Sequence, residues 1–368
     1  MKKIKYLSAV LTIFTLIFVI SVIFTAQAAD NEYRYTCDYM YEVIQSSEEK
    51  QFYDDLKESC EIVDNSYERY DHIELVPIPR SMNDDRVLEI MMIFIYDNPQ
   101  YFWLDVNYDF KGREPWRVKF YSNGYFTLNV LDYFRDGDVR QAAKIKVMSA
   151  AQEYIDGALR YSTQYERARY LYRRLLDEVE YQEGEWDQTI ASVFLQKQTV
   201  CAGYSKAYAM LCNAVGIDAL STTSVSHAWN IIKLSDYWFI VDITNDNNSY
   251  KYFLLSDRST AEEDSRMSAS IHHIIDRNAY VRYYDSYPKC LYDYKEVEST
   301  MPAPEYILGD ANNDGIVNVR DVAFIAKCLS KGNGSILPVQ ADCDRDGKIT
   351  VRDAAALAFS LASGTELF

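Results

Sequence analysis

The stretch "QTVCAGYSKAYAMLCNAVGI", residues 198–217, decides how this chain is interpreted. Apolar residues recur at the spacing of a helix, and the buried stripe is predicted to contain Tyr204, Tyr208, Leu211, Cys212 and Val215. Thr199 is a suitable N-cap, and Gly216 is a suitable C-terminal stop. The pattern therefore predicts a helix whose first turn contains Cys201.

A cysteine in the first turn of a helix has two interpretations. The first-turn N–H groups have no intrahelical partner and the helix dipole is positive there, so a reactive thiolate is favoured. Alternatively, Cys201 is simply a small buried hydrophobe. Its position in the helix does not decide between the two. Cys212 lies about 16 Å further along the helix, too far for a disulfide, and is expected in the core.

A second stretch, "SVSHAWNIIKLSDYWFIVDIT" at 224–244, predicts a β-hairpin. With Ser235-Asp236 in the turn, Trp229 lies opposite Asp242 and His227 is the diagonal neighbour on the same face. With the turn centred on Leu234-Ser235, His227 lies directly opposite Asp242. Both registers join an imidazole to a carboxylate, the arrangement that orients a catalytic histidine. This pair makes Cys201 a predicted nucleophile.

These motifs resemble the core of the transglutaminase-like superfamily, a papain-related fold, over about residues 160–250. The resemblance implies an α+β fold in which the cysteine-bearing helix packs on an antiparallel sheet. It also implies that Cys201 is the nucleophile, His227 the general base and acid, and Asp242 the orienting carboxylate. Bacterial members commonly have Asp-Pro-Thr after the second strand, where this chain has Asp242-Ile243-Thr244.

Such a triad implies chemistry on amide bonds. The thiolate attacks an amide carbonyl, His227 protonates the leaving amine, and a thioester remains. Water or a primary amine then completes peptide hydrolysis, deamidation or acyl transfer, and hydrolysis is favoured because water is always available. The backbone N–H of Cys201 is one expected oxyanion donor. Gln196 and Gln198 are only near in sequence, so the second donor stays unnamed.

The N-terminal part of the chain predicts export. Lysines precede an apolar run from Leu7 to about Thr25, and Ala26-Gln27-Ala28 matches a cleavage site, so residues 1–28 are predicted to be a signal peptide. The alternative is a retained membrane anchor, because about 20 apolar residues can span a bilayer. A net charge of −17 with 48% hydrophobic residues indicates an acidic globular protein and makes nucleic acid an unsuitable partner. The expected location is extracellular, with attachment to a scaffold or the cell surface.

Two regions precede the linker. Residues 30–135 are predicted to be an α+β module with helices at 48–59 and 84–96, and with strands within 101–110, 116–122 and 125–133. Asn123-Gly124 indicates a two-residue hairpin. The "DNPQYFWL" segment at 97–104 resembles a region often found upstream of transglutaminase-like cores, but no chemistry is assigned to this module. Residues 136–298 form the predicted catalytic domain, which needs no cofactor.

After a Pro-containing linker, 299–308, the chain repeats a twelve-residue acidic loop: "DANNDGIVNVRD" at 310–321 and "DCDRDGKITVRD" at 342–353. Oxygen-bearing residues stand at positions 1, 3, 5, 9 and 12, Gly at 6 and a backbone carbonyl at 7, as in EF-hand calcium loops. The predicted Ca²⁺ ligands are Asp310, Asn312, Asp314, the Ile316 carbonyl, Asn318 and Asp321, then Asp342, Asp344, Asp346, the Lys348 carbonyl, Thr350 and Asp353.

The flanks of these loops differ from an ordinary EF-hand. Pro302 and Pro304 disfavour an entering helix, so only the exit is helical. The duplication resembles a type I dockerin domain over 309–368. That resemblance implies an all-α module with two Ca²⁺ ions that binds a cohesin domain of a scaffold protein, as in cellulosomes. Val319-Arg320 and Val351-Arg352 stand at positions 10 and 11, where dockerins read their partner, and their identity predicts two binding orientations.

Three functions remain open at this point. The first is a scaffold-docked cysteine enzyme acting on proteins or peptides. The second is a catalytically silent binding or structural module of a cellulosome. The third is a polysaccharide-degrading component, which would place the protein in polysaccharide catabolism, although no catalytic carboxylate pair can be identified. Seven cysteines without a repeated spacing do not indicate a disulfide framework, although Cys328 and Cys343 could pair.

Overall fold

The computed structural model describes residues 33–367, except 106–117, 225–226, 245–249, 267–286, 303–305, 333 and 335–336. The chain divides into two units, Met1–Arg34 and Tyr35–Phe368, and the structure below is that of the second. The predicted signal peptide lies outside the described residues. Within the described part of the chain, every helix is too short or too polar to cross a bilayer.

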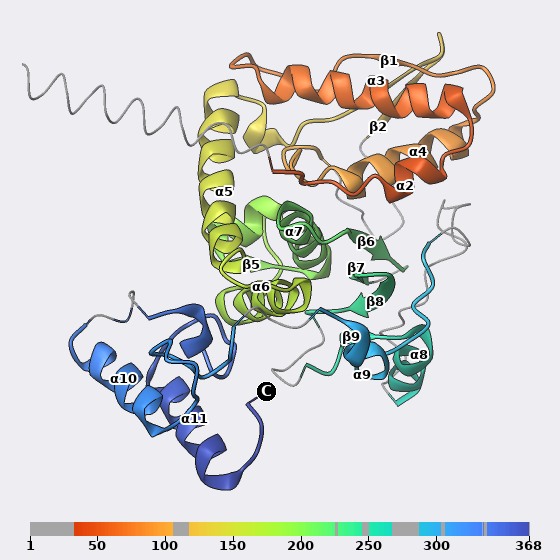
Figure 1. Ribbon diagram of the computed structural model, residues 1–368. Coiled ribbons are helices and arrows are strands. Elements are labelled where there is room, and N and C mark those ends of the chain that lie inside the picture. Colours follow the sequence, from red (N-terminus) through yellow and green to blue (C-terminus); the bar gives the residue numbers. More distant parts are fainter. Residues whose placement is uncertain are drawn as a thin grey trace, which may run out of the picture. The chain divides into compact units, whose positions relative to one another are not determined.

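The first elements after Tyr35 are helices and a small sheet (Figure 1). They are α2 (Tyr39–Val43), α3 (Ser47–Asp64), β1 (Val76–Pro77), α4 (Asp84–Asp97), β2 (Val118–Tyr121) and β3 (Tyr125–Leu128). The strands form an antiparallel sheet in the order β1-β3-β2. Ser46 and Asn83 cap α3 and α4 by accepting backbone N–H bonds. Both predicted helices are therefore confirmed, and α3 runs to Asp64, five residues beyond the predicted end.

Two strand predictions in this region were wrong. Tyr121 pairs with Tyr125, so the hairpin loop holds three residues and not two; Gly124 adopts a left-handed φ of 82°, as a three-residue loop requires. Residues 101–105 form a turn with one isolated bridge from Leu104 to Val130 and are not a strand. The aromatic side chains there are buried, and Tyr101 stacks on Phe94 of α4, so packing produced the apolar pattern. Residues 106–110 lie outside the described residues.

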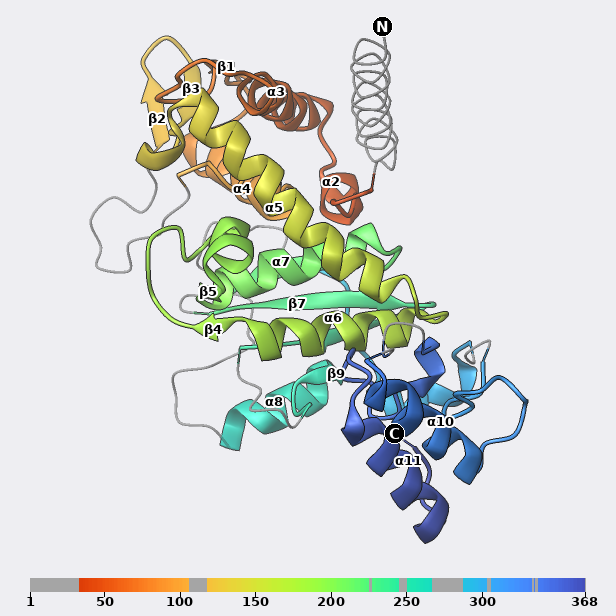
Figure 2. The same cartoon turned by 90° about the vertical axis from the view of Figure 1, so that its left-hand side faces the viewer.

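The middle of the chain combines helices with antiparallel strands. After η1 (Asp132–Phe134) come α5 (Gly137–Ala158), α6 (Gln164–Glu178), β4 (Glu180–Tyr181), η2 (Ser192–Gln196), β5 (Gln198–Thr199) and α7 (Cys201–Ala214). The main sheet follows, in the order β6 (Ala219–Thr223), β7 (Ala228–Leu234), β8 (Tyr237–Val241) and β9 (Phe253–Leu255). Helix α7 packs against β6 and β7 and against α6 (Figure 2). The short elements α8 (Asp257–Arg266), α9 (Tyr294–Val297) and η4 (Glu298–Thr300) complete this part.

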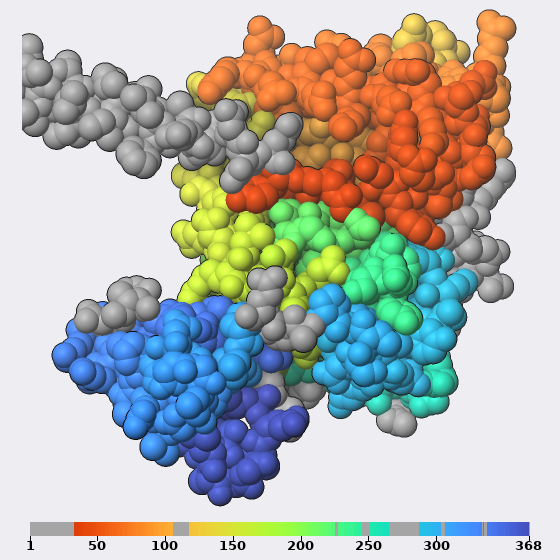
Figure 3. Space-filling view, in the orientation of Figure 1, coloured from red at the N-terminus to blue at the C-terminus, as the bar shows by residue number. Residues whose placement is uncertain are grey.

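The C-terminal part consists of two helices and their preceding loops. Helices α10 (Val319–Ser330) and α11 (Val351–Ser363) each begin at a capping box, with η6 (Val339–Ala341) between them. They pack on each other around a small buried core that includes Ile325, Leu357, Cys328 and Cys343. Figure 3 shows the surface of this C-terminal part in blue. All seven cysteines lie in the described part of the chain, and none of them forms a disulfide.

Candidate functional site

The first turn of α7 positions Cys201. The thiol-bearing residue is the first residue of the helix and is half-buried. The N-cap is Val200, not Thr199 as predicted, because Thr199 belongs to β5 and its hydroxyl donates to the Asp187 carbonyl at 2.6 Å. The Val200 N–H donates to that same carbonyl at 3.2 Å. A Cβ on Gly203 would lie 1.9 Å from the Thr199 hydroxyl oxygen, so only glycine allows this close approach.

The hairpin places His227 against Asp242. Leu234 pairs with Tyr237, so the turn is Ser235-Asp236, and Ser235 has a left-handed φ of 52°. Of the two registers considered, this is the one that makes His227 the diagonal neighbour of Asp242. His227 Nε2 lies 2.8 Å from Asp242 Oδ2, and both side chains are buried. The sequence-predicted contact between imidazole and carboxylate is therefore present.

The carboxylate is itself held in place. The Thr244 N–H donates to Asp242 Oδ1 at 2.9 Å, so the second carboxylate oxygen also has a partner. The backbone N–H of Asp242 donates to the Tyr252 carbonyl at 2.9 Å. The Trp229 ring stacks on the His227 ring, with centroids 6.0 Å apart and planes 16° from parallel. These contacts fix the orientation of both side chains, as a histidine that moves protons requires.

Cys201 lies on the other side of the histidine. Burial alone would lower the pKa of His227, but hydrogen bonds to Asp242 and to the Cys201 thiol raise it to about 10. Because Nε2 faces Asp242, the nitrogen on the thiol side is Nδ1. A protonated imidazole beside a thiol favours the thiolate–imidazolium form of the pair. The arrangement can supply a nucleophile and a proton donor at neutral pH.

Three further side chains near Cys201 were missed by sequence reasoning. Tyr181 interacts through its hydroxyl with both the thiol and the backbone N–H of Cys201. Lys206 is buried in the same helix, and Tyr96 of α4 lies over it. Charge on Cys201 contributes to the pKa shifts of all three groups.

The sequence patterns that could have identified Tyr181, Lys206 and Tyr96 were weak or absent. Tyr181 reaches Cys201 because β4 and β5 pair in parallel, with Tyr181 opposite Thr199. Such a two-residue ladder has no sequence pattern of its own. Lys206 stands within the motif that identified the helix, but a lysine in a helix usually faces solvent. A charged residue among apolar neighbours was the only available sign.

The two acidic loops share one hydrogen-bond pattern. Each loop's first aspartate, Asp310 or Asp342, accepts the N–H groups of positions 5 and 6 at 2.8–3.1 Å. Each loop's last aspartate, Asp321 or Asp353, accepts those of positions 3 and 9 at 2.7–3.3 Å. The Gly at position 6 has a φ of 81° or 85°. The repeat predicted from the sequence is therefore also a structural repeat.

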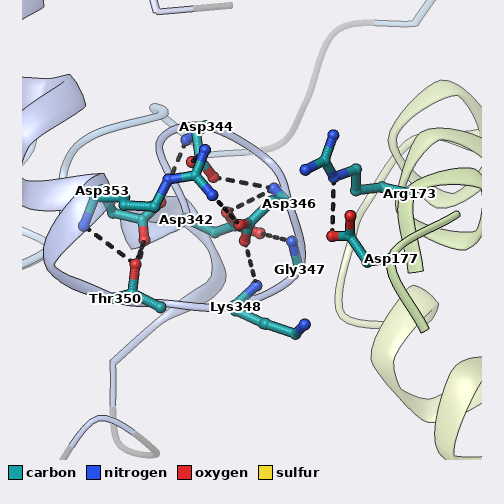
Figure 4. Close-up of polar contacts among 10 residues, drawn as sticks. Arg173, Asp177, Asp342, Asp344, Asp346, Gly347, Lys348, Thr350 and Asp353 are labelled. Carbon is teal, nitrogen blue, oxygen red and sulfur yellow. Dashed lines mark hydrogen bonds and ion pairs between the residues drawn. The ribbon is translucent and has the colours of Figure 1, made fainter. Parts of the chain in front are cut away.

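The oxygen atoms of the second loop are gathered as a cation site requires. One carboxylate oxygen each from Asp342, Asp344 and Asp353 lies within 4.8 Å of the other two (Figure 4). Burial, with the nearby charges of Asp353 and Asp346, raises the pKa of Asp342 to about 7. The first loop has Asn312 where the second has Asp344, so it offers an amide oxygen there. Clustered hard oxygen donors suit Ca²⁺, and the residues present fit this ion.

The two loops differ in their surroundings. In the second loop, the Tyr161 hydroxyl donates to Asp342, and the Tyr170 ring lies against Gly347. Arg173 and Asp177 of α6 appear beside the same loop (Figure 4). A Cβ on Gly315, the matching glycine of the first loop, would meet nothing within 4 Å.

The residues predicted to read the partner are all exposed. Val319 and Val351 have 72% and 73% of their surface exposed, and Arg320 and Arg352 are exposed beside them. Arg352 also lies 3.6–3.7 Å from carboxylate oxygens of Asp344 and Asp346. Both copies of the dipeptide are therefore accessible.

Comparison with protein families finds two matches. The model of the transglutaminase-like superfamily matches residues 152–243, and the model of the dockerin type I domain matches residues 308–361. The chain thus joins a transglutaminase-like core to a C-terminal type I dockerin domain. Dockerin domains bind cohesin domains of scaffold proteins.

Other comparisons add little. No curated protein matches the chain in sequence. A solved structure titled "Crystal structure of a TGase" is 13% identical over 39% of this chain and 46% of its own, with a TM-score of 0.25. The chain thus spans less than half the length of that protein. A menin structure described as revealing the binding site for Mixed Lineage Leukemia protein is 14% identical over 85% of this chain and 63% of its own, with a TM-score of 0.27. Scores this low carry no argument about function.

Proposed function

We propose that this protein is an exported cysteine enzyme that acts on amide bonds of proteins or peptides while its dockerin domain holds it on a scaffold. The observation that carries the proposal is the His227–Asp242 contact of 2.8 Å beside a cysteine at the start of a helix. In this proposal the core packs as in papain-like enzymes, with α7 on the antiparallel sheet. The domains are the signal peptide 1–28, the module 30–135, the catalytic domain 136–298, the linker 299–308 and the all-α dockerin 309–368.

The reaction follows from the residue types. The Cys201 thiolate attacks the amide carbon, which forms the C–S bond and a tetrahedral oxyanion. Collapse of that intermediate breaks the C–N bond, and His227 gives its proton to the leaving amine. Asp242 orients the ring and stabilises its charged form. Water, deprotonated by His227, then releases the acid from the thioester; a primary amine in place of water gives acyl transfer.

The oxyanion needs two donors. The backbone N–H of Cys201 is the first, since it lies at the start of α7 where intrahelical partners are missing. Tyr181 is the best-supported second donor, because its hydroxyl interacts with both that N–H and the thiol. Burial, followed by the charge of Cys201, raises the pKa of Tyr181 to about 12, so the phenol keeps its proton for donation.

The experiment compares the wild-type protein with Cys201→Ala on glutamine-containing peptides, with and without a fluorescent primary amine. New peptide termini indicate hydrolysis, ammonia release alone indicates deamidation, and incorporated amine indicates transfer. Cys212→Ala is the matched control, because it removes a thiol from the same helix. If no product depends on Cys201 across a broad peptide library, the enzyme function is rejected and a silent binding module remains.

We also infer that the dockerin domain holds two Ca²⁺ ions and binds cohesin through Val319-Arg320 or Val351-Arg352. The ions would be held by the oxygen atoms of both loops and would offset the repulsion among their carboxylates. Cohesin binding measured by calorimetry should disappear with a chelator and return with Ca²⁺. Two usable orientations predict that Val319→Asp with Arg320→Asp leaves binding intact, whereas changing both dipeptides abolishes it. Loss of binding after the first change alone would exclude two orientations.

A further inference from the structure

The second acidic loop of the dockerin domain contacts the transglutaminase-like core. The hydroxyl of Tyr161, between α5 and α6, donates to Asp342 Oδ2, and the two residues are only 4% and 2% exposed. Asp310 is the matching residue of the first loop. Within the described part of the chain, its carboxylate accepts only the N–H groups of Asp314 and Gly315, both from its own loop. The first aspartates of the two loops therefore differ by one buried donor, which the core supplies.

A glycine of the second loop makes another contact with the core. Tyr170 of α6 lies so close to Gly347 that a Cβ on this glycine would be 2.5 Å from the ring. Gly347 stands at position 6 of its loop and has a φ of 85°. Gly315, at position 6 of the first loop, has a φ of 81°, and a Cβ there would meet nothing within 4 Å. The two glycines therefore share a backbone conformation and differ in what lies beside them.

The core holds the Tyr170 ring in place by its own contacts. Arg174, one turn further along α6, donates to the Tyr170 hydroxyl at 2.9 Å. On the side of α5, a Cβ on Gly157 would lie 1.8 Å from the same hydroxyl, so the ring approaches the helix closely at this glycine. The ring edge that meets Gly347 thus belongs to a surface that residues of the core already order.

A third contact anchors the end of the linker. Tyr306 donates its hydroxyl to Glu166 Oε1 at 2.6 Å. Glu166 is buried and belongs to the capping box of α6, in which its other oxygen accepts the Thr163 hydroxyl at 2.9 Å. Tyr161, Glu166 and Tyr170 form one surface of the core, which we call the docking face. It contacts the linker and the second loop at three separate points.

The docking face reaches the predicted ion site itself, because Asp342 is the first Ca²⁺ ligand expected in the second loop. Oδ2 accepts both the Tyr161 hydroxyl and the Gly347 N–H. Among the residues that the structure describes, Oδ1 accepts only the Asp346 N–H. A carboxylate has about four acceptor positions, so Oδ1 keeps one for a cation. Hydrogen bonds to a ligating carboxylate fix its orientation, and loss of such a partner lowers metal affinity by about 10–100-fold.

We propose that the docking face orders the second loop of the dockerin domain for Ca²⁺: Tyr161 holds Asp342 in position, and Tyr170 supports the loop at Gly347. This inference rests on the proposed binding of Ca²⁺ by the two loops. Tyr161 is a positioning residue, since it acts on the ion through Asp342. The core is then part of the second ion site, so the two sites are expected to respond differently to changes in the core.

The first test is a calorimetric titration of the mature chain with Ca²⁺ alone. Tyr161→Phe removes only a hydroxyl and should raise one of the two Ca²⁺ dissociation constants about tenfold, while the other changes less than about twofold. Tyr154→Phe is the control, because it removes a buried phenol that donates to a carboxylate within the core, that of Glu178, at 2.8 Å. Two unchanged constants in folded Tyr161→Phe, or tighter binding, would overturn the inference.

The second test compares the two glycines by small-angle X-ray scattering in Ca²⁺. Gly347→Ala and Gly315→Ala carry the same cost of a positive φ, but only Gly347→Ala drives a methyl group into the Tyr170 ring. Gly347→Ala should therefore have a larger radius of gyration than the wild type and Gly315→Ala, since the linker 299–308 can reach up to about 36 Å once the loop is released. Equal radii in all three proteins would overturn the docking. Wild-type protein that binds no Ca²⁺ would instead reject the proposed ions.

Discussion

The two cysteines of α7, Cys201 and Cys212, lie in one helix but in different surroundings. Cys201 opens the helix, half-buried, beside His227 and Tyr181. Cys212 is completely buried near the other end, where burial raises the pKa of its thiol and the Tyr208 hydroxyl is its polar neighbour. Both residues belong to one helix and are the same residue type. The difference teaches that neighbours and exposure, rather than the cysteine itself, decide whether a thiol is a candidate nucleophile.

Removing each thiol in turn should give the largest contrast. Cys201→Ala should lower product formation by at least about 10³-fold, because it removes the nucleophile that forms the thioester. Cys212→Ala should leave turnover within about twofold and lower the free energy of unfolding by about 1–2 kcal/mol through a small cavity. Peptide turnover and urea denaturation measure the two effects. Equal losses of activity in Cys201→Ala and Cys212→Ala would show that the two thiols do not differ in function.

Replacing His227 should remove most of the difference in reactivity between Cys201 and Cys212. His227→Ala should reduce turnover by about 10²–10⁴-fold, since it deletes the general acid and base. Alkylation of Cys201 at pH 7 should also slow, whereas Cys212 should be unaffected. Circular dichroism checks the fold. A His227→Ala protein that alkylates Cys201 at the wild-type rate would show that the thiol reacts without the imidazole.

Tyr181 should separate two kinds of reaction at the same thiol. Tyr181→Phe should lower peptide turnover by about 10²-fold, the usual cost of one oxyanion donor. Alkylation of Cys201 by iodoacetamide creates no oxyanion and should change less than about threefold. Tyr204→Phe is a suitable control, because that hydroxyl donates to the Val179 carbonyl from the same helix as Cys201. If Tyr181→Phe raised both rates, the tyrosine would be an obstruction and not a donor.

The pH dependence of stability should show the smallest effect. The pKa of His227 is raised to about 10 from a usual value of 6.5, so the imidazolium is stabilised by the fold. That contribution to stability is complete below about pH 6.5 and is lost as the pH rises through about 10. The difference in free energy of unfolding between the wild type and His227→Ala should therefore shrink as the pH rises from 6.5 to 10, as urea denaturation can measure. A difference that stays constant or grows over this range would contradict the pairing of His227 with Asp242.

The sequence was sufficient for the parts that rest on local patterns. The helix of Cys201 and the hairpin of His227 and Asp242 follow from periodicity and turn residues, and the structure contains both. The two repeated acidic loops with Gly at position 6 could also be predicted from the sequence.

Other parts depend on contacts that are not local in sequence. Tyr181 meets Cys201 only through the parallel pairing of β4 with β5, and Tyr96 meets Lys206 across more than a hundred residues. Thr199 is a suitable residue type for an N-cap, but it lies in β5 and its hydroxyl donates to the Asp187 carbonyl, so Val200 takes the cap position. Patterns along the chain predict elements well, whereas the pairing of short strands and the burial of a single lysine depend on tertiary packing.

The most direct test is the alkylation of the folded wild-type protein by limiting iodoacetamide at pH 7, with the modified cysteines identified by peptide mass mapping. A thiolate–imidazolium pair predicts that Cys201 is modified at least about 10²-fold faster than Cys212. It also predicts that His227→Ala removes most of this preference. Similar rates at the two cysteines, or a preference for Cys201 that survives the loss of His227, would contradict the assignment of Cys201 as an activated nucleophile.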